Sequence, residues 1–223
     1  MFAAIMTTIH FIRHAESQGN VNHHLIGGQS NHYLLTERGE SQARLLGERL
    51  HREGYQFDQV FASTAVRARE TARIACGFLG LDLTTIDYSP QLLELSQGEW
   101  EGKSRADIYT PEKKAEVWGN PLHFKAPGGE SQQEVADRMR AWLDGALAGL
   151  DHKQDQVIAA FSHGFAIKTL ISRILLADPA FTYRMVTHNT SITTLQFTGR
   201  QFLLERFNDF QHLHSTDFIG HYG

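Results

Sequence analysis

The stretch that decides the fold is Ile9-His10-Phe11-Ile12-Arg13-His14-Ala15-Glu16-Ser17-Gln18-Gly19-Asn20. Its apolar, β-branched first part ends abruptly at Arg13 and His14, and small and polar residues follow. A strand followed by a polar loop is how an α/β protein presents reactive side chains at the carboxyl edge of its sheet. Arginine offers a fork of donors for phosphate oxygens, and a neutral histidine can attack phosphorus. An Arg-His pair is also common at purely structural strand ends, so the stretch predicts a strand over 7–13 and leaves its chemistry open.

The composition is that of an ordinary globular protein. The chain has 223 residues, 41% hydrophobic and 21% charged, enough for one domain with a sizeable core. A net charge of −4 leaves no broad basic surface, so we expect no nucleic-acid and no membrane partner. Cys76 is the single cysteine, and the opening residues have no basic region like that of a signal peptide. We therefore expect a cytoplasmic protein without an intrachain disulfide.

Strands and helices are predicted to alternate in the first ninety residues, after a polar loop at 17–35. Thr36 and Ser63 are each expected to cap a helix. Short strand–helix–strand connections imply parallel pairing with right-handed crossovers. The expected elements are a helix from about 36 to 52, a strand at 59–62, a helix from 63 to about 79 and a strand at 83–88.

The second half of the chain begins with a less regular segment at 91–129, where glycine, proline and tryptophan interrupt short helical pieces. This pattern favours a small cap inserted at about 95–130 rather than a linker. Ser131-Gln132-Gln133-Glu134 is a capping box that opens an amphipathic helix. Then follow a buried strand at 156–161, an apolar helix at 165–176, a hairpin over 192–197 and 202–207, and a loosely held tail from 208. The predicted fold class is α/β: a single domain over 1–223, a three-layer sandwich with a mostly parallel central sheet, helices on both faces and a small helical or loop cap insertion.

Three further segments could supply chemistry at the same edge of the sheet. The strand at 156–161 runs into Ser162-His163-Gly164 and then a helix, whose first N–H groups can face an anion. Arg67 lies near a helix start, where a cation opposes the helix dipole unless an anion shares the site. Glu94 is a carboxylate among leucines. Each residue also has an ordinary structural explanation, but two histidines at one sheet edge favour a functional site.

Together these segments resemble the histidine phosphatase (phosphoglycerate mutase-like) superfamily. Ala15 departs from the family's pattern, in which glycine is more usual, but it keeps a small side chain beside the histidine. We therefore expect activity to be retained. The motifs occur in the family's order: Arg-His-Ala-Glu-Ser at 13–17 with Asn20, Leu-Thr-Glu-Arg-Gly at 35–39, the segment 63–71, Glu94 with Trp-Glu-Gly at 100–102, and Ser-His-Gly at 162–164.

The resemblance implies a phosphate monoester hydrolase that needs no metal and no cofactor. His14 would be the nucleophile, forming a phosphohistidine. Glu94 would protonate the leaving oxygen and then accept a proton from the hydrolytic water. The other catalytic residues implied are Arg13, Arg67 and His163, and the implied substrate-binding residues are Ser17, Asn20, Lys103 and the amide of Gly164.

Within the superfamily, the sequence favours the phosphatase branch. Mutases carry a tyrosine and a lysine for the substrate carboxylate after the catalytic glutamate, whereas the stretch 96–103 has Lys103 but no tyrosine. The insert before His163 is also short for a mutase. The alternatives are a 2,3-bisphosphoglycerate-dependent phosphoglycerate mutase and a non-catalytic phosphate-binding or scaffold protein. A metallophosphoesterase is disfavoured because there is no clustered Asp/His ligand pattern.

The expected partner is a small phosphorylated metabolite or a phosphorylated side chain. Its identity would depend on the cap residues Lys103, Arg105, Trp118 and Lys125. His23 and His24 could line the mouth of the pocket or lie in a solvated loop. His212 and His214 form a His-x-His pair, but without carboxylates nearby a loosely held tail is expected rather than a metal site.

Overall fold

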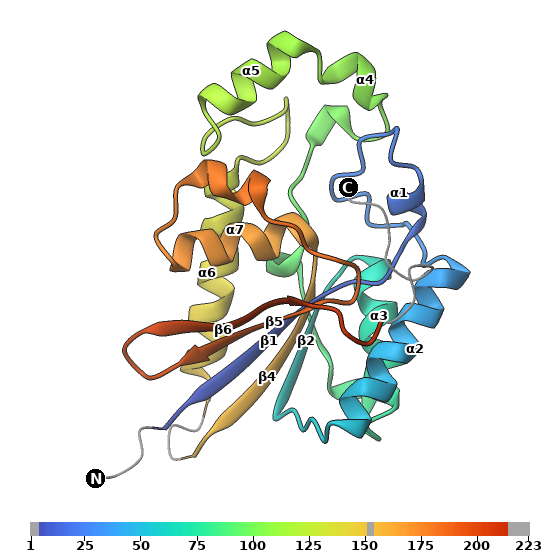
Figure 1. Ribbon diagram of the computed structural model, residues 1–223, viewed down its shortest axis with the longest axis vertical. Coiled ribbons are helices and arrows are strands. Elements are labelled where there is room, and N and C mark those ends of the chain that lie inside the picture. The colour runs from blue at the N-terminus through green and yellow to red at the C-terminus, as the bar shows by residue number, and fades with distance from the viewer. Residues whose placement is uncertain (1–4, 151–153, 214–223) are drawn as a thin grey trace.

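The computed structural model describes residues 5–150 and 154–213. Its core is a six-stranded sheet with the order β3-β2-β4-β1-β5-β6 (Figure 1). β1, β2, β3 and β4 are mutually parallel, and β5 and β6 form an antiparallel hairpin beside β1. The predicted α/β fold with a mostly parallel sheet is confirmed. The strands are β1 (Thr7–Arg13), β2 (Gln59–Ser63), β3 (Asp87–Ser89), β4 (Gln156–Ser162), β5 (Ile192–Phe197) and β6 (Phe202–Asp209).

Helices cover both faces of this sheet (Figure 1). Side chains of β1 alternate between the two faces, as strand geometry requires. Ile9 and Phe11 pack with residues of α6 and α7, whereas Ile12 packs with residues of α2 and α3. The α-helices are α1 (Gln18–Val21), α2 (Glu37–Arg52), α3 (Val66–Gly77), α4 (Arg105–Ile108), α5 (Pro111–Gly119), α6 (Gln132–Ala148) and α7 (Gly164–Ile174).

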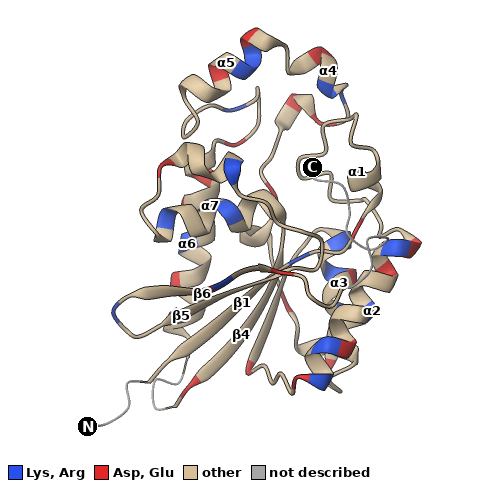
Figure 2. Cartoon of the chain, in the orientation of Figure 1, with Lys and Arg blue, Asp and Glu red and all other residues tan. Residues whose placement is uncertain are grey.

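The helix surfaces carry charges of both signs, as Figure 2 shows along α2 and α5. In α2 the first turn is acidic and the last turn is basic, which complements the helix dipole. Among the described residues, no helix has both the length and the apolar character that a membrane span would need.

The segment between β3 and α6 contains α4 and α5, which lie at the carboxyl-end side of β1 (Figure 1). It has a small core of its own, in which Trp100 packs against Ile26 and Ala126. Tyr109 and Phe124 place their ring centroids 5.8 and 5.9 Å from that of Trp100. Ile26 comes from the loop after β1, so this core joins the segment to the loop that follows Arg13 and His14.

Two local predictions were wrong. Ser63 does not cap a helix: it ends β2, and α3 begins at Val66 after Ala65. The strand predicted at 83–88 is mostly not a strand, because Leu83–Thr85 forms a 3₁₀ turn and only Asp87–Ser89 pairs with β2. In that turn Asp82 accepts the N–H of Thr84, a local bond that competes with strand pairing.

The loosely held tail predicted from Asn208 is also wrong for residues 208–213. Asn208 and Asp209 still belong to β6, and Arg49 donates to both carboxylate oxygens of Asp209 at 2.9 and 2.7 Å. His212 is buried, with Nε2 2.8 Å from the hydroxyl of Thr190. His214 lies outside the described residues. Within 5–150 and 154–213, no three His, Cys, Asp or Glu side chains are grouped so that they could hold a metal ion.

A prediction about stability follows from the buried ion pair between Arg49 and Asp209. Burial alone raises the pKa of Asp209, but hydrogen bonds from Arg49 and Gln211 outweigh it and lower that pKa to about 2. A lowered carboxyl pKa stabilises the fold above the unfolded value of 3.8, and this stabilisation is lost as the pH falls through about 2. We expect Asp209→Asn to lower the free energy of unfolding at pH 7 by about 2 kcal/mol.

Urea unfolding of the wild type and the variant between pH 7 and pH 2 measures this effect, and the difference should shrink below pH 4. Asp144→Asn is the matched control, because Asp144 pairs with Arg140 on an exposed helix surface. Such pairs contribute less than about 1 kcal/mol. Equal losses for the two variants at pH 7 would contradict a stabilising role for the buried pair.

Candidate active site

His14 follows β1 directly, and its two ring nitrogens have different partners. Nδ1 lies 2.7 Å from the carbonyl oxygen of Ala15, which can only accept, so Nδ1 carries the proton. Nε2 accepts the Nε–H of Arg67 at 3.3 Å. The lone pair of Nε2 therefore points toward a guanidinium group. An anionic group bound by that guanidinium would therefore lie close to Nε2, which is unprotonated and can act as a nucleophile.

The surroundings of His14 favour its neutral form. Burial lowers the pKa of His14 well below its ordinary value of 6.5, and the charges of Arg67 and Arg13 lower it further. The imidazole is thus uncharged at neutral pH and keeps its lone pair.

The register of the sheet brings the second histidine to the first. Arg13 pairs with Ser162 in the parallel β1–β4 ladder, and the N–H of His14 donates to the carbonyl of Ser162 at 2.9 Å. The rings of His14 and His163 consequently have centroids 5.0 Å apart. Nε2 of His163 lies 2.8 Å from Oγ of Ser63, the residue that ends β2. Three neighbouring strands therefore meet at this site.

Two buried nitrogen atoms at the site have no hydrogen-bond partner in the described part of the chain: Nε of Arg13 and Nδ1 of His163. An unpaired buried polar group is costly, so such atoms indicate a place for a ligand oxygen. Gly164 permits this geometry, because a Cβ there would lie 3.2 Å from Nε of Arg13 and 3.0 Å from the hydroxyl of Thr187. The other end of the Arg13 guanidinium donates to the carbonyl of Thr187.

The loop after α1 binds the NH1 end of the Arg67 guanidinium. Its NH1 group donates to the carbonyls of Gln29 and Ser30 at 2.9 and 3.1 Å. The carboxylate of Glu101 accepts the N–H groups of the same two residues. Gly28, with φ of +55°, leaves room for that carboxylate, since a Cβ there would lie 2.3 Å from Oε1 of Glu101. Burial lowers the pKa of Arg67 to about 10, although nearby Glu94 opposes the shift, so Arg67 remains a cation at pH 7.

Glu94 lies on the N-terminus of α7. Its carboxylate accepts the N–H groups of Phe165 and Ala166 at 3.1 and 3.0 Å, and that of Leu95 at 2.9 Å. A helix N-terminus favours a negative group through its free N–H groups and its dipole. Since α7 begins immediately after His163, this contact places Glu94 at the same edge of the sheet as both histidines.

Comparison with known proteins agrees with this geometry. The sequence profile of the histidine phosphatase superfamily (branch 1) matches residues 9–210, which covers most of the chain and every motif discussed above. The chain belongs to this superfamily. The resemblance inferred from the sequence is thereby confirmed.

Its relatives include both mutases and phosphatases. A protein named probable phosphoglycerate mutase GpmB, from Salmonella paratyphi B, is 33% identical over 218 residues, covering 93% of this chain and 95% of that protein. Phosphoserine phosphatase from Entamoeba histolytica, solved with phosphoserine, is 25% identical with a TM-score of 0.78, covering 93% and 99% of the two chains. The alpha-ribazole phosphatase of Shigella flexneri is 25% identical with a TM-score of 0.74, covering 91% and 96%.

In this member of the superfamily, Ser17 and Asn20 lie together in the loop that follows His14. Oδ1 of Asn20 accepts the N–H and hydroxyl of Ser17 at 3.0 and 3.1 Å. These bonds use the oxygen of Asn20, so its nitrogen is the atom that faces other partners. Ser17 is itself buried and supports Asn20. Ala15 is also buried, and its N–H donates to Oγ1 of Thr71 at 3.0 Å, so the site accommodates the methyl group where glycine is more usual.

Sequence reasoning missed Asn189. Its side-chain nitrogen donates to the carbonyl of His14 at 2.9 Å and lies 3.4 Å from Oδ1 of Asn20. The available signal was the short polar run 187–191 directly before a strand. By contrast, Lys103 is exposed. His23 and His24 are likewise exposed, with ring centroids 6.4 Å apart.

Proposed function

We propose that this chain hydrolyses phosphate monoesters without a metal ion and that the phosphoryl group passes through His14. The observation that carries the proposal is the neutral imidazole whose Nε2 lone pair points at Arg67. A phosphoryl group bound by that guanidinium would present its phosphorus to Nε2. The unpartnered atoms Arg13 Nε and His163 Nδ1, with the nitrogen of Asn20 and the amide of Gly164, would then donate to its oxygens. Fixed donors of this kind stabilise the charge that spreads over a transferring phosphoryl group.

The proposed reaction has two steps. In the first, Nε2 of His14 bonds to phosphorus and the ester P–O bond breaks. Glu94, carrying a proton delivered by the monoanion of the substrate, gives that proton to the leaving oxygen. The ring gains positive charge as it is phosphorylated, and the Nδ1–H bond to Ala15 supports that charge. In the second step, Glu94 takes a proton from water as the water oxygen attacks phosphorus. The P–N bond then breaks and phosphate leaves.

A small phosphorylated metabolite is the proposed substrate, with a phosphorylated side chain as the wider possibility. Two solved structures of one relative support a small acid, since the Entamoeba phosphoserine phosphatase was solved with phosphoserine and with 3-phosphoglyceric acid. In this proposal, residues 95–130 are a cap within a single domain spanning 1–223. The single cysteine supports a cytoplasmic location.

A phosphoglycerate mutase is the second candidate, favoured by the likeness to the protein named GpmB. A mutase must bind the carboxylate of a phosphorylated acid and keep water from the phosphohistidine. The lysine expected for that carboxylate, Lys103, is exposed. The stretch 96–103 also contains no tyrosine. Hydrolysis therefore remains the better proposal.

A panel of phosphate monoesters, assayed in excess EDTA, tests the function. We expect phosphate release to continue in EDTA and to be inhibited by vanadate, which mimics a five-coordinate phosphoryl group. We also expect 3-phosphoglycerate with catalytic 2,3-bisphosphoglycerate to yield little 2-phosphoglycerate. Loss of activity in EDTA that a divalent metal restores would overturn the phosphohistidine route. Isomerisation faster than phosphate release from every monoester would make the protein a mutase.

A further inference from the structure

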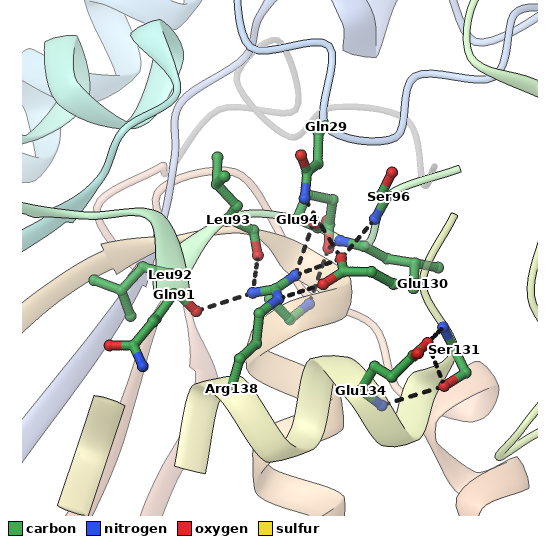
Figure 3. Close-up of polar contacts among 12 residues, drawn as sticks. Gln29, Gln91, Leu92, Leu93, Glu94, Ser96, Glu130, Ser131, Glu134 and Arg138 are labelled. Atoms are coloured by element: carbon green, nitrogen blue, oxygen red, sulfur yellow. Dashed lines mark hydrogen bonds and ion pairs between the residues drawn. The ribbon is translucent and has the colours of Figure 1, made fainter. Parts of the chain in front are cut away.

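The guanidinium group of Arg138, on α6, donates to the segment that carries Glu94 and to the carboxylate of Glu130 (Figure 3). NH1 donates to the carbonyls of Gln91 and Leu93 at 2.9 and 2.8 Å. NH2 donates to the carbonyl of Glu94 at 2.9 Å and to Oε2 of Glu130 at 2.9 Å. Nε donates to Oε1 of Glu130 at 2.7 Å. All five N–H groups of this arginine are therefore engaged, three of them by backbone carbonyls around Glu94.

Glu130 fixes the other side of the same segment. Its Oε2 accepts the N–H of Ser96 at 2.9 Å, and its own N–H donates to the carbonyl of Ser96 at 2.9 Å. Burial raises the pKa of Glu130, but the hydrogen bonds from Arg138 and Ser96 outweigh it and lower that pKa. The carboxylate is thus ionised at neutral pH. Together, Arg138 and Glu130 hold the backbone both before and after Glu94.

This support replaces regular secondary structure. Residues 93–97 belong to no helix or strand, so their carbonyl and N–H groups lack the partners that a ladder would supply. The carboxylate of Glu94 is fixed at its other end by the first N–H groups of α7. Glu94 is consequently held between α6, through its backbone, and α7, through its side chain.

We propose that Arg138, oriented by Glu130, is the positioning residue for the general acid Glu94. The proposal rests on the proposed function, because it needs Glu94 to transfer the proton. Arg138 does not touch the phosphoryl site: it acts by setting where the backbone of Glu94 lies. A proton donor displaced by even about 1 Å from the leaving oxygen loses much of its effect. Lysine cannot take over this role, because its single ammonium group cannot reproduce a planar fork of five donors.

The test uses Arg138→Lys with an alkyl and an aryl phosphate as substrates. An alkoxide needs a proton as it leaves, whereas an aryl oxide leaves readily without one. We expect kcat for the alkyl phosphate to fall about 10-fold or more and kcat for the aryl phosphate to fall about 3-fold or less, with little change in KM. Arg140→Lys is the matched control, because Arg140 is on the same helix and its guanidinium pairs with exposed Asp144 and lies over the ring of Phe202. This control should leave both rates unchanged.

A double variant separates positioning from a general loss of structure. If Arg138 acts through Glu94, then Glu94→Gln/Arg138→Lys should be no slower on the alkyl phosphate than Glu94→Gln alone, because the proton donor is already gone. Glu130→Gln is the second route, since it leaves Arg138 in place and breaks the bidentate pair. We expect it to give a weaker form of the same alkyl-selective loss. Glu130→Gln also tests the positioning role if Arg138→Lys does not fold.

The outcomes distinguish the two proposals. If Glu94→Gln slows both substrates equally, Glu94 is not the acid, and the proposed function fails at that point. If Glu94→Gln is alkyl-selective but Arg138→Lys or Glu130→Gln slows both substrates alike, the positioning role is overturned. Fully multiplied losses in the double variant would overturn it as well.

Discussion

Replacing His14 by alanine is expected to abolish phosphate release, with a loss of about 10³-fold or more in kcat. The variant removes Nε2, the only protein atom that the proposed reaction bonds to phosphorus. The fold should tolerate the change, because the backbone bonds of residue 14 to Ser162 and Asn189 do not involve the imidazole. Steady-state release of phosphate from an aryl phosphate measures the loss. His23→Ala, at an exposed histidine, is the matched control and should keep full activity.

The covalent intermediate provides the second readout for His14. Acid quenching destroys a phosphohistidine, so the wild type should be stopped in base during turnover. The expected product is an acid-labile, base-stable phosphoryl adduct on the peptide that contains His14. The adduct should be absent from the alanine variant. An adduct on His163 would mean that the two histidines have exchanged roles, which the free Nδ1 of His163 makes the natural alternative.

Glu94→Gln should slow the hydrolysis of alkyl phosphates far more than that of aryl phosphates. General acid catalysis typically contributes about 10²–10⁴-fold, and an alkoxide leaving group needs it most. We expect a loss in that range for an alkyl phosphate and of less than about 10-fold for an aryl phosphate. Glu99→Gln is the matched control, since Glu99 is an exposed glutamate of the same segment.

Equal losses on both substrates would show that Glu94 is structural or that another carboxylate is the acid. Glu16 is a poor substitute for that role. Its carboxylate already accepts from the hydroxyl of Thr36 at 2.8 Å and from Arg38 at 3.1 Å. These bonds bind Glu16 to the start of α2, and its pairing with Arg38 makes it a support for the loop after His14.

Most strands of the sheet, the family and the order of the site segments could be predicted from the sequence alone. The apolar run before Arg13 and the buried run before His163 are signals of local periodicity and β propensity, and both strands form where they were predicted. Parallel pairing then brings both histidines to one edge, because the carboxyl ends of parallel strands lie together. The segments at Arg67 and Glu94 were recognised through their resemblance to the superfamily's motifs, because the local context of each residue also fits an ordinary structural role.

The residues that support this site are identified by contacts that form only in the folded chain. Asn189 holds the carbonyl of His14 across 175 positions, and Ser63 meets His163 across 100 positions. In the sequence, Arg138 is an ordinary charged residue of an amphipathic helix. Its role becomes visible only when the fold brings the 91–96 segment next to it. The polar sequence around Asp209 predicts a loosely held tail, whereas the structure places the buried side chain of Arg49 beside Asp209. In each case the supporting contact is a hydrogen bond between segments that are far apart in the chain. The hydrophobic periodicity and the secondary-structure propensity of either segment do not predict which partner it will have.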